Sequence, residues 1–242
     1  MMTDHPGRVS VIIPVHNGER FLAEALNSVY AQDYRPIEVI VVDDGSEDRS
    51  ARIASSHEGV TVISQQNLGL AAARNTGIAA ATGEFIAFLD ADDLMLPNKL
   101  SEQVGYMRVH PEVGCTLAAW QNFGDDVDEE VPEPVPPPSR PLNVTRPEAL
   151  VHLRAGGISA VIKRDALDIV GRFDTSFDFA EDLDWLFRLR EAPVEAVILP
   201  RVTDRKRFHA TNMTRDRSAA RNGWLRFMKG VAERRHSEGS RS

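Results

Sequence analysis

The sequence predicts an α/β fold, in which a mostly parallel sheet flanked by helices is joined to a smaller mixed region. Two observations support this prediction. Short β-branched runs alternate with amphipathic segments through the first half of the chain. The chain also has 242 residues, 42% of them hydrophobic, which is enough for one sizeable core. We therefore expect a single α/β domain with appendages.

The first half of the chain has the pattern of β-α-β units. Val9–Val15 is an apolar run, and the apolar residues within 21–29 fall on one face of a helix. Ile37–Val42 follows as a second strand, apolar enough to be buried on both faces. Three further strands and three further helices are expected in this half, at 60–63, 85–89 and 113–120 and at 47–56, 70–81 and 97–107.

A proline-rich stretch separates the first half from the second. Between Asp125 and Pro141 an acidic run precedes closely spaced prolines, which neither a central strand nor a helix interior accommodates. The stretch predicts a loop, either an exposed spacer or a mobile flap over a groove. Beyond it, the patterns predict strands at 158–162 and 194–199, helices at 165–170 and 181–190, and an amphipathic helix at 219–233.

Charge and cysteine content exclude several classes of protein. The 28 Lys and Arg against 36 Asp and Glu give a net charge of −8, so a globally basic surface for nucleic acid is absent. Residues 205–242 are nevertheless basic, which suits a solvated helix, or a patch for phosphates, an acidic acceptor or an anionic membrane surface. Cys115 is the only cysteine, so no internal disulfide forms.

The sequence contains no targeting or membrane-spanning pattern. No stretch approaches the roughly 20 consecutive apolar residues of a membrane span, and residues 1–8 lack the apolar core of a signal peptide. We expect a cytoplasmic protein, whose contact with a membrane would be peripheral. The final amphipathic helix is expected to pack on the domain or on a second subunit, which would make a homodimer.

Polar residues follow four successive predicted strands, at the edge where open α/β sheets bind ligands. These clusters are His16–Asn17, Asp43–Ser46, Gln66–Asn67 and Asp90–Asp93. Asp90 and Asp92 indicate chemistry most directly, because closely spaced carboxylates repel one another unless a cation or donated hydrogen bonds offset the cost. Mg²⁺ or Mn²⁺ bridging the carboxylates to diphosphate oxygens would do so. Taken alone, the pair also suits a solvated turn before the helix near Pro97.

Several motifs stand in a fixed order over residues 8–110, namely Val9–Glu19, Val41–Ser46, Asn67–Gly69, Ala73–Asn75 and Phe88–Asp93. In this order and at about these spacings they resemble the family 2 glycosyltransferases with the GT-A fold. The first strand is followed by neither a GxGxxG fingerprint nor a GxxxxGK[ST] loop, which disfavours dinucleotide oxidoreductases and P-loop phosphotransferases. We expect one GT-A domain over residues 1–215, with a donor half 8–123, a proline-rich loop 125–144, an acceptor half 145–215 and a basic tail 216–242.

The resemblance implies a pocket for a nucleoside-diphosphate sugar, a UDP-sugar in the first place. Pro14, Asn17 and Glu19 would line the base and ribose, and Asp44 would accept a hydrogen bond from the uracil ring. The other implied donor-binding residues are His16, Asn67, Arg74, Asp90, Ala91 and Arg207. His16 stands where the family usually has Tyr, so the base would either stack on the imidazole ring or be held differently. Arg74 also suits a structural ion pair with Asp90 or Asp43.

The resemblance also implies the metal and the catalytic base. Asp92 and His209 would bind the divalent ion that holds the diphosphate. Asp182, the second acid of Glu181-Asp182, would abstract the acceptor proton in a reaction that inverts the anomeric configuration. Acids such as Asp184 in a first helical turn are favoured by the helix dipole without any catalysis, and this remains the alternative for Asp182.

Three further expectations concern the sugar pocket and rival functions. Ser159 is expected near the donor sugar, whereas Trp120 and Trp185 are assigned to the core. The acceptor, whether a glycan, a lipid, a peptide or a small molecule, is not indicated. A sugar nucleotidyltransferase and a non-catalytic subunit that binds nucleotide sugars remain the alternative functions, and the first is disfavoured because no positive charge follows the first strand before Arg20.

Overall fold

The computed structural model describes residues 5–124, 134–154, 159–210, 212 and 221–230. Within them the strands are β1 His5–Val15, β2 Ile37–Asp44, β3 Val60–Gln65, β4 Gly83–Phe88, β5 Leu94–Met95, β6 Val113–Phe123, β7 Leu142–Asn143, β8 Ala160–Lys163 and β9 Glu195–Arg207. The helices are α1 Leu22–Tyr30, α2 Ser50–Ser55, α3 Leu70–Ala80, α4 Lys99–Val109, α5 Leu150–Arg154, α6 Arg164–Val170 and α7 Glu181–Glu191, with a 3₁₀ turn η1 at Pro147–Ala149. Residues 221–230 form one more helix.

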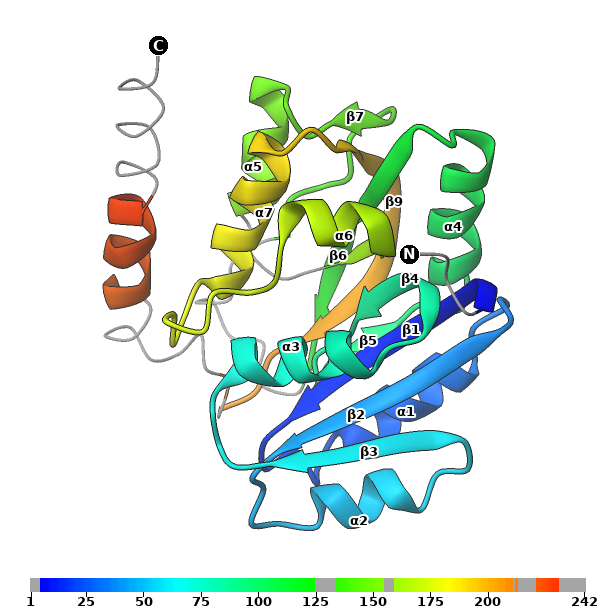
Figure 1. The fold of residues 1–242 in the computed structure, drawn as a ribbon, viewed down its shortest axis with the longest axis vertical. Helices are drawn as coiled ribbons and strands as arrows, with labels where there is room; N and C mark the ends of the chain where they lie inside the picture. Colours follow the sequence, from blue (N-terminus) through cyan, green and yellow to red (C-terminus); the bar gives the residue numbers. More distant parts are fainter. Residues whose placement is uncertain (1–4, 125–133, 155–158, 211, 213–220, 231–242) are drawn as a thin grey trace.

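One sheet carries all the described strands, in the order β3-β2-β1-β4-β8-β6-β9-β5, with β7 paired to β9 (Figure 1). The first four strands of this order are mutually parallel, as buried runs of Val and Ile favour. β8 then runs antiparallel between β4 and β6, and β6 pairs in parallel with β9. The predicted fold class, a mostly parallel sheet with a smaller mixed region, is confirmed.

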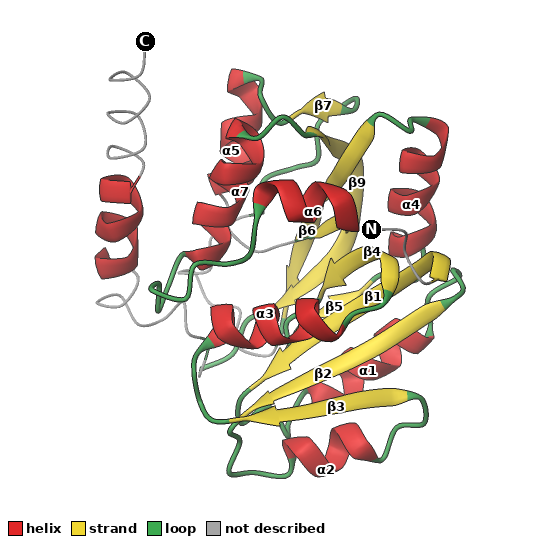
Figure 2. Cartoon of the chain, in the orientation of Figure 1, coloured by secondary structure: helices red, strands yellow, loops and turns green. Residues whose placement is uncertain are grey.

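Helices cover both faces of the sheet and enclose two apolar cores (Figure 2). The side chains of α3, α5, α6 and α7 pack with one face. Those of α1, α2 and α4 pack with the other. Helix α3 lies close against β1, because a Cβ atom on Gly77 would stand only 2.3 Å from Cγ2 of Ile12. This close packing fixes the loop before α3 at the end of the parallel strands.

The structure differs from the predicted elements at several places. β9 continues to Arg207 rather than ending at residue 199, because hydrogen bonds to β5 and β6 hold its charged second half in the sheet. The short strand β7 lies inside the stretch predicted as a loop. Parts of two predicted elements, residue 158 and residues 219–220 and 231–233, fall outside the described residues, as does the acidic run 125–133. In the described part of the chain, no helix has the length and apolar character that crossing a bilayer requires.

Candidate active site

The ends of β1 and β2 bring together several predicted donor-binding residues. His16 Nδ1 lies 2.9 Å from the carbonyl oxygen of Asp44, and His16 Nε2 lies 3.1 Å from Asn17 Nδ2 and 3.3 Å from Asn67 Nδ2. His16, Asn17 and Asn67 are exposed, so they form an accessible polar surface. Asn17 adopts a positive φ of 53°, which Asn tolerates better than most residues and which turns the chain sharply after β1.

Asp44 lies beneath this surface and is only 3% exposed. Its Oδ1 accepts hydrogen bonds from Gln65 Nε2 and the Leu68 amide, at 2.6 and 2.9 Å. Its Oδ2 accepts one from the Gly69 amide at 2.9 Å, which leaves that oxygen a second lone pair. The carboxylate therefore fixes the loop before α3 and keeps one acceptor position for a further N–H donor.

The other residues expected around the base are engaged in contacts within the protein or packed in its interior. Glu19 is partly exposed, and its Oε2 accepts from both the amide and Nε of Arg49 at 3.0 Å. Pro14 lies buried in β1 beside Val42, so it shapes the floor of the strand end rather than its surface. Ala91 packs against the core on the side of α1, α2 and α4.

Arg74 does not face the surface but lies buried between two carboxylates. Its Nη1 donates to Glu181 Oε1 at 2.6 Å and its Nη2 donates to Asp90 Oδ1 at 2.8 Å. Burial alone would raise the pKa of Asp90, but the guanidinium outweighs it and lowers that pKa. Burial and the neighbouring Asp182 raise the pKa of Glu181, against the influence of Arg74. Arg74 thus forms the structural ion pair with Asp90 and joins it to the start of α7.

The structure brings Asp92 and His209 together across 117 residues of sequence. His209 Nε2 lies 3.0 Å from Asp92 Oδ2, and Asn212 Nδ2 lies 3.4 Å from the same oxygen. Burial and the charge of Asp90 raise the pKa of Asp92, although His209 opposes the shift. A divalent cation beside this carboxylate would offset the cost of ionising it, so the donor set fits Mn²⁺ or Mg²⁺.

The chain supplies only part of such a metal site. Over the residues described, no three His, Cys, Asp or Glu side chains gather closely enough to hold a metal ion. Asp92 and His209 would provide one oxygen and one nitrogen ligand, and phosphate and water oxygens would have to provide the others. Completion by phosphate and water oxygens is usual for Mg²⁺, whereas an imidazole nitrogen suits a transition metal better than it suits Mg²⁺.

Arg207 is held by the loop that carries the aspartates. Its Nε donates to the carbonyl oxygen of Asp92 at 2.9 Å and its Nη2 to Glu24 Oε2 at 2.6 Å. The Arg207 amide donates to Asp93 Oδ1 at 2.8 Å. The guanidinium also lies 4.7 Å from the ring centroid of Phe21. In this structure Arg207 therefore positions Asp92 and Asp93, and direct binding of the donor by Arg207 stays a prediction.

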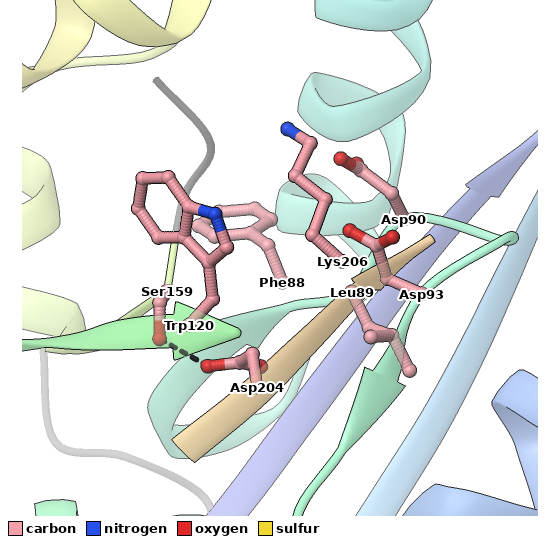
Figure 3. Close-up of a pocket in the computed structure, with 8 residues that line it drawn as sticks. All are labelled: Phe88, Leu89, Asp90, Asp93, Trp120, Ser159, Asp204 and Lys206. Carbon is pink, nitrogen blue, oxygen red and sulfur yellow. Dashed lines mark hydrogen bonds between the residues drawn. The ribbon is translucent and has the colours of Figure 1, made fainter. Parts of the chain in front are cut away.

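A pocket of about 340 Å³, measured with its open mouth, lies beyond Asp90 at the junction of the parallel and mixed parts of the sheet (Figure 3). It is lined by Phe88, Leu89, Asp90, Asp93, Trp120, Ser159, Asp204 and Lys206. Ser159 lines this pocket, and its position near the donor sugar stays a prediction. The assignment of Trp120 to the core is wrong, because its ring forms a wall of this pocket. Trp185, with none of its surface exposed, does lie in the core.

Asp204 and Lys206 are pocket residues that the sequence did not reveal. They stand two positions apart on β9, so their side chains share one face of that strand. The alternation is visible in the sequence, but only once β9 is known to extend past residue 199. Buried Lys99 donates to Asp204 Oδ2 at 2.7 Å and to Ser159 Oγ at 3.1 Å, which secures the floor of the pocket.

The acids at the pocket mouth surround one ammonium group. Burial would lower the pKa of Lys206, but Asp93 and Asp90, with smaller contributions from Asp182 and Asp92, raise it. Burial and Asp92 raise the pKa of Asp93 well above its ordinary value, against the influence of Lys206. Lys206 Nζ also lies 5.9 Å from the ring centroid of Trp120. The carboxylate of Asp182 therefore lies within electrostatic range of the pocket.

Asp182 is the second residue of α7 and is partly exposed. Its Oδ1 accepts a hydrogen bond from the Leu183 amide at 2.7 Å. The turn before the helix passes through Ala180, which adopts a left-handed conformation with a φ of 71° directly before the first turn of α7. Glu181, at the first position, is fixed by its ion pair with Arg74 and is the neighbour of Asp182.

Comparison with known proteins relates this site to one family. The family model described as glycosyl transferase family 2 matches residues 10–169. An uncharacterized glycosyltransferase of Rickettsia typhi is 31% identical over 238 residues, which cover 90% of this chain and 71% of that protein. An uncharacterized glycosyltransferase of Rickettsia conorii is 31% identical over 211 residues, and there the match spans only 34% of the longer protein.

Solved structures share the fold. S. aureus TarS 1-349 in complex with UDP-GlcNAc aligns with a TM-score of 0.73 at 22% identity, over 86% of this chain and 61% of that chain. The mannosyltransferase PcManGT from Pyrobaculum calidifontis, in complex with GDP-Man and Mn²⁺, aligns with a TM-score of 0.71 at 24% identity, over 95% of this chain and 65% of that chain. The open mixed sheet with flanking helices is thus of the GT-A type.

Proposed function

Because the chain belongs to glycosyl transferase family 2, we propose that it transfers a sugar from a nucleoside-diphosphate sugar to an acceptor, with inversion at the anomeric carbon. The observation that supports this most is the convergence of Asp90, Asp92, Asp182 and His209 from three distant segments on one edge of the sheet. Carboxylates that lie close together despite their mutual repulsion are typical of a site that binds phosphates through a cation.

We propose that the nucleotide lies on the surface formed by His16, Asn17 and Asn67. The free lone pair on Asp44 Oδ2 suits an N–H of the base, and a uracil N3–H is such a donor. UDP-GlcNAc bound to TarS and GDP-Man bound to PcManGT support a nucleotide sugar in general, since the two neighbours carry different bases. A UDP-sugar is the first donor to test.

We propose that the diphosphate lies between this surface and Asp92, with Asp92 and His209 holding a divalent ion. That ion, when bound, would stabilise the negative charge that develops on the departing diphosphate. Arg207 and the Asp93 carboxylate would keep the Asp92 loop in place. The sugar ring would then enter the neighbouring pocket, where Trp120 offers an apolar face and Asp204 and Lys206 offer partners for hydroxyl groups.

We propose that Asp182 acts as the base. Its carboxylate takes the proton from the acceptor hydroxyl as the acceptor oxygen bonds to the anomeric carbon. The bond between that carbon and the diphosphate oxygen breaks, and its electron pair leaves with the diphosphate. Attack on the face opposite the leaving group inverts the anomeric configuration. Helix α7, which carries Asp182, is held to Asp90 through Arg74.

The decisive experiment compares Asp182→Asn with Asp178→Asn. Asp178 is an exposed acid four residues earlier, so its replacement controls for the loss of one negative charge. Nucleoside diphosphate released from UDP-GlcNAc and other nucleotide sugars is measured with Mn²⁺. We expect D182N to lose at least about 100-fold in turnover with unchanged donor binding, as removal of a general base does, and D178N to keep its activity. Full activity of a folded D182N chain would exclude Asp182 as the base.

The same assay separates the rival functions. A sugar nucleotidyltransferase would release pyrophosphate from a nucleoside triphosphate and a sugar phosphate, whereas a glycosyltransferase releases a nucleoside diphosphate. A non-catalytic subunit would bind nucleotide sugars without turning any of them over. Release of the nucleoside diphosphate, even through slow hydrolysis of the donor, would support the proposed enzyme.

A further inference from the structure

The helix at residues 221–230 is firmly seated on the acceptor side of the molecule (Figure 1). Phe227, 1% exposed, packs in an apolar cluster with Phe177, Ala180 and Leu183. Its ring lies edge-on to Phe187, with the centroids 4.9 Å apart. Figure 1 shows this helix, coloured orange-red, standing beside α7 at the edge of the molecule.

A close contact fixes which side of the helix faces outward. A Cβ atom on Gly223 would stand 2.6 Å from the carbonyl oxygen of Phe179, so only glycine allows the helix to approach this far. Gly223 and Phe227, four residues apart, therefore mark the inner side of the helix. This packing leaves the opposite side of the helix facing outward.

The outer side combines exposed apolar residues with cations. Leu225 and Met228 are 63% and 52% exposed. They are two of the seven large exposed apolar side chains among the described residues. Arg221 and Lys229, each four residues from Leu225, are exposed on this side, and Arg226 is exposed at its edge, where its guanidinium lies 5.7 Å from the ring centroid of Phe177. The described helix contains no acidic residue. An exposed apolar strip between cations is the pattern of a helix that lies in a membrane interface.

We propose that this outer side docks on an anionic lipid surface. In the sequence, residues 215–235 hold seven Lys or Arg against two acids, Asp216 and Glu233, although the molecule as a whole has a net charge of −8. A second copy of the chain is a poor occupant, because a two-fold interface would place these cations against themselves. Nucleic acid would leave Leu225 and Met228 without an apolar partner.

Docking would bring one part of the active site to the lipid. The seat of the helix includes Ala180 and Leu183, which flank the first turn of α7 where Asp182 lies. A chain bound through residues 221–230 would therefore hold the acceptor side of the site close to the membrane surface. This inference does not depend on the proposed function, since lipid binding requires neither a nucleotide sugar nor turnover.

The test measures sedimentation of the full chain with lipid vesicles. Vesicles of phosphatidylcholine with about 30 mol % phosphatidylglycerol should bind it, and pure phosphatidylcholine should not, because the anionic lipid supplies the attraction. Reversing two cations, R221E/K229E, should weaken binding by at least about 25-fold, taking about fivefold for each cation. Leu225→Glu should weaken it by about tenfold or more through loss of the inserted apolar group.

Val109→Glu is the matched control. Val109 is 75% exposed on α4, so the substitution introduces the same charge on another apolar surface residue and should leave binding unchanged. Circular dichroism melting checks that every variant folds. Absence of vesicle binding by the unmodified chain, equal binding to pure phosphatidylcholine, equal binding by all variants, or a Leu225-dependent dimer without lipid binding would each overturn the proposal.

Discussion

Arg74 shows how burial decides the strength of an ion pair. Arg74 is 2% exposed and bridges Glu181 and Asp90, whereas Arg49 contacts Glu19 at 3.0 Å with 69% of its own side chain exposed. The two arginines have similar contact distances and different surroundings. Removing a partner of a buried pair leaves an uncompensated charge in a poorly solvated place, whereas an exposed pair is replaced by water.

We therefore predict that Arg74→Met destabilises the protein by about 3 kcal/mol or more. Methionine keeps much of the volume beside Phe173, so the loss reports the charge rather than a cavity. Arg49→Met serves as the control and should cost less than about 1 kcal/mol. Urea unfolding followed by circular dichroism gives both values. Equal costs for the two substitutions would contradict the argument from burial.

Glycines inside helices test how closely two elements pack. Gly77 in α3 would bring a Cβ atom to 2.3 Å from Ile12 in β1, whereas a Cβ on Gly105 in α4 would meet nothing within 4 Å. We predict that Gly77→Ala lowers the free energy of unfolding by about 1–3 kcal/mol through overpacking. Gly105→Ala should raise it by up to about 1 kcal/mol, because alanine restricts the unfolded helix segment more than glycine does. Thermal melts of the two variants should shift in opposite directions relative to the unmodified protein. Stabilisation by G77A would show that α3 can move away from β1.

Glu38 ties β1, β2 and the start of β4 together. Its Oε2 accepts hydrogen bonds from Ser10 Oγ at 2.5 Å and the Thr82 amide at 2.8 Å, and its Oε1 accepts one from Thr82 Oγ1 at 2.8 Å. Burial would raise the pKa of Glu38, but these hydrogen bonds outweigh it and lower the pKa. These contacts join the parallel strands near their amino-terminal ends, at the edge of the sheet opposite the active site.

The lowered pKa gives a defined pH dependence. The folded pKa of Glu38 is below that of the unfolded chain, so its stabilising contribution is present above the unfolded pKa, about 4.3, and is lost as pH falls through the folded pKa. We predict that Glu38→Gln lowers the melting temperature at neutral pH and that the gap to the unmodified protein narrows below about pH 4. Melting temperatures of both proteins across this range give the test. A gap that widens in acid would mean that Glu38 is not stabilised as a carboxylate.

Sequence patterns predicted the elements well where apolar spacing was clear. The parallel strands of the first half and helices α3 and α7 lie within a few residues of their predicted limits, because buried Val and Ile runs or Ala-rich repeats define them. The second half of β9 was missed, because Asp204 and Lys206 interrupt the apolar pattern. Those charged residues are held in the sheet by partners far away in sequence, such as Lys99, and no local pattern shows such contacts.

Some features of the candidate site could likewise be predicted from the sequence, and others could not. Asp92 and His209 were placed together by the family resemblance and do lie side by side. Arg74 was expected either to bind the donor or to pair with Asp90 or Asp43, and it pairs with Asp90 and Glu181. Arg207 was expected to bind the donor and contacts Glu24, so donor binding by these arginines stays a prediction. A motif identifies an arginine near the site, but only the folded chain shows which carboxylate it contacts. Trp120 joins the pocket for a similar reason, since β8 pairs with β6 only as far as Leu117, whereas β6 continues beside β9 past Trp120.

At the scale of the whole molecule, the two halves of the chain share one sheet. β8, from the second half, lies between β4 and β6, and β6 pairs only with β8 and β9 among the described strands. A fragment ending at residue 124 would expose the edge of β4 and leave β6 without a partner. Cys115 and Leu117 on β6, which are almost fully buried in the intact chain, would then be exposed to solvent. The donor half is therefore not expected to fold cooperatively by itself.

We predict that the intact chain unfolds in one transition, because separating the halves would break the middle of the sheet. The probe is Trp185 of α7, isolated in the W120F/W224F variant, and its fluorescence should change at the same temperature as the far-ultraviolet circular dichroism. UDP with Mn²⁺ at about 100 times its Kd should raise both midpoints together, by roughly 5–10 °C, since binding to the folded state adds about 2.7 kcal/mol. The fragment of residues 1–124 should show no cooperative melt under the same conditions. Two separated transitions in the intact chain, with UDP shifting only the first, would mean that the donor half folds and binds independently of the strands that follow it.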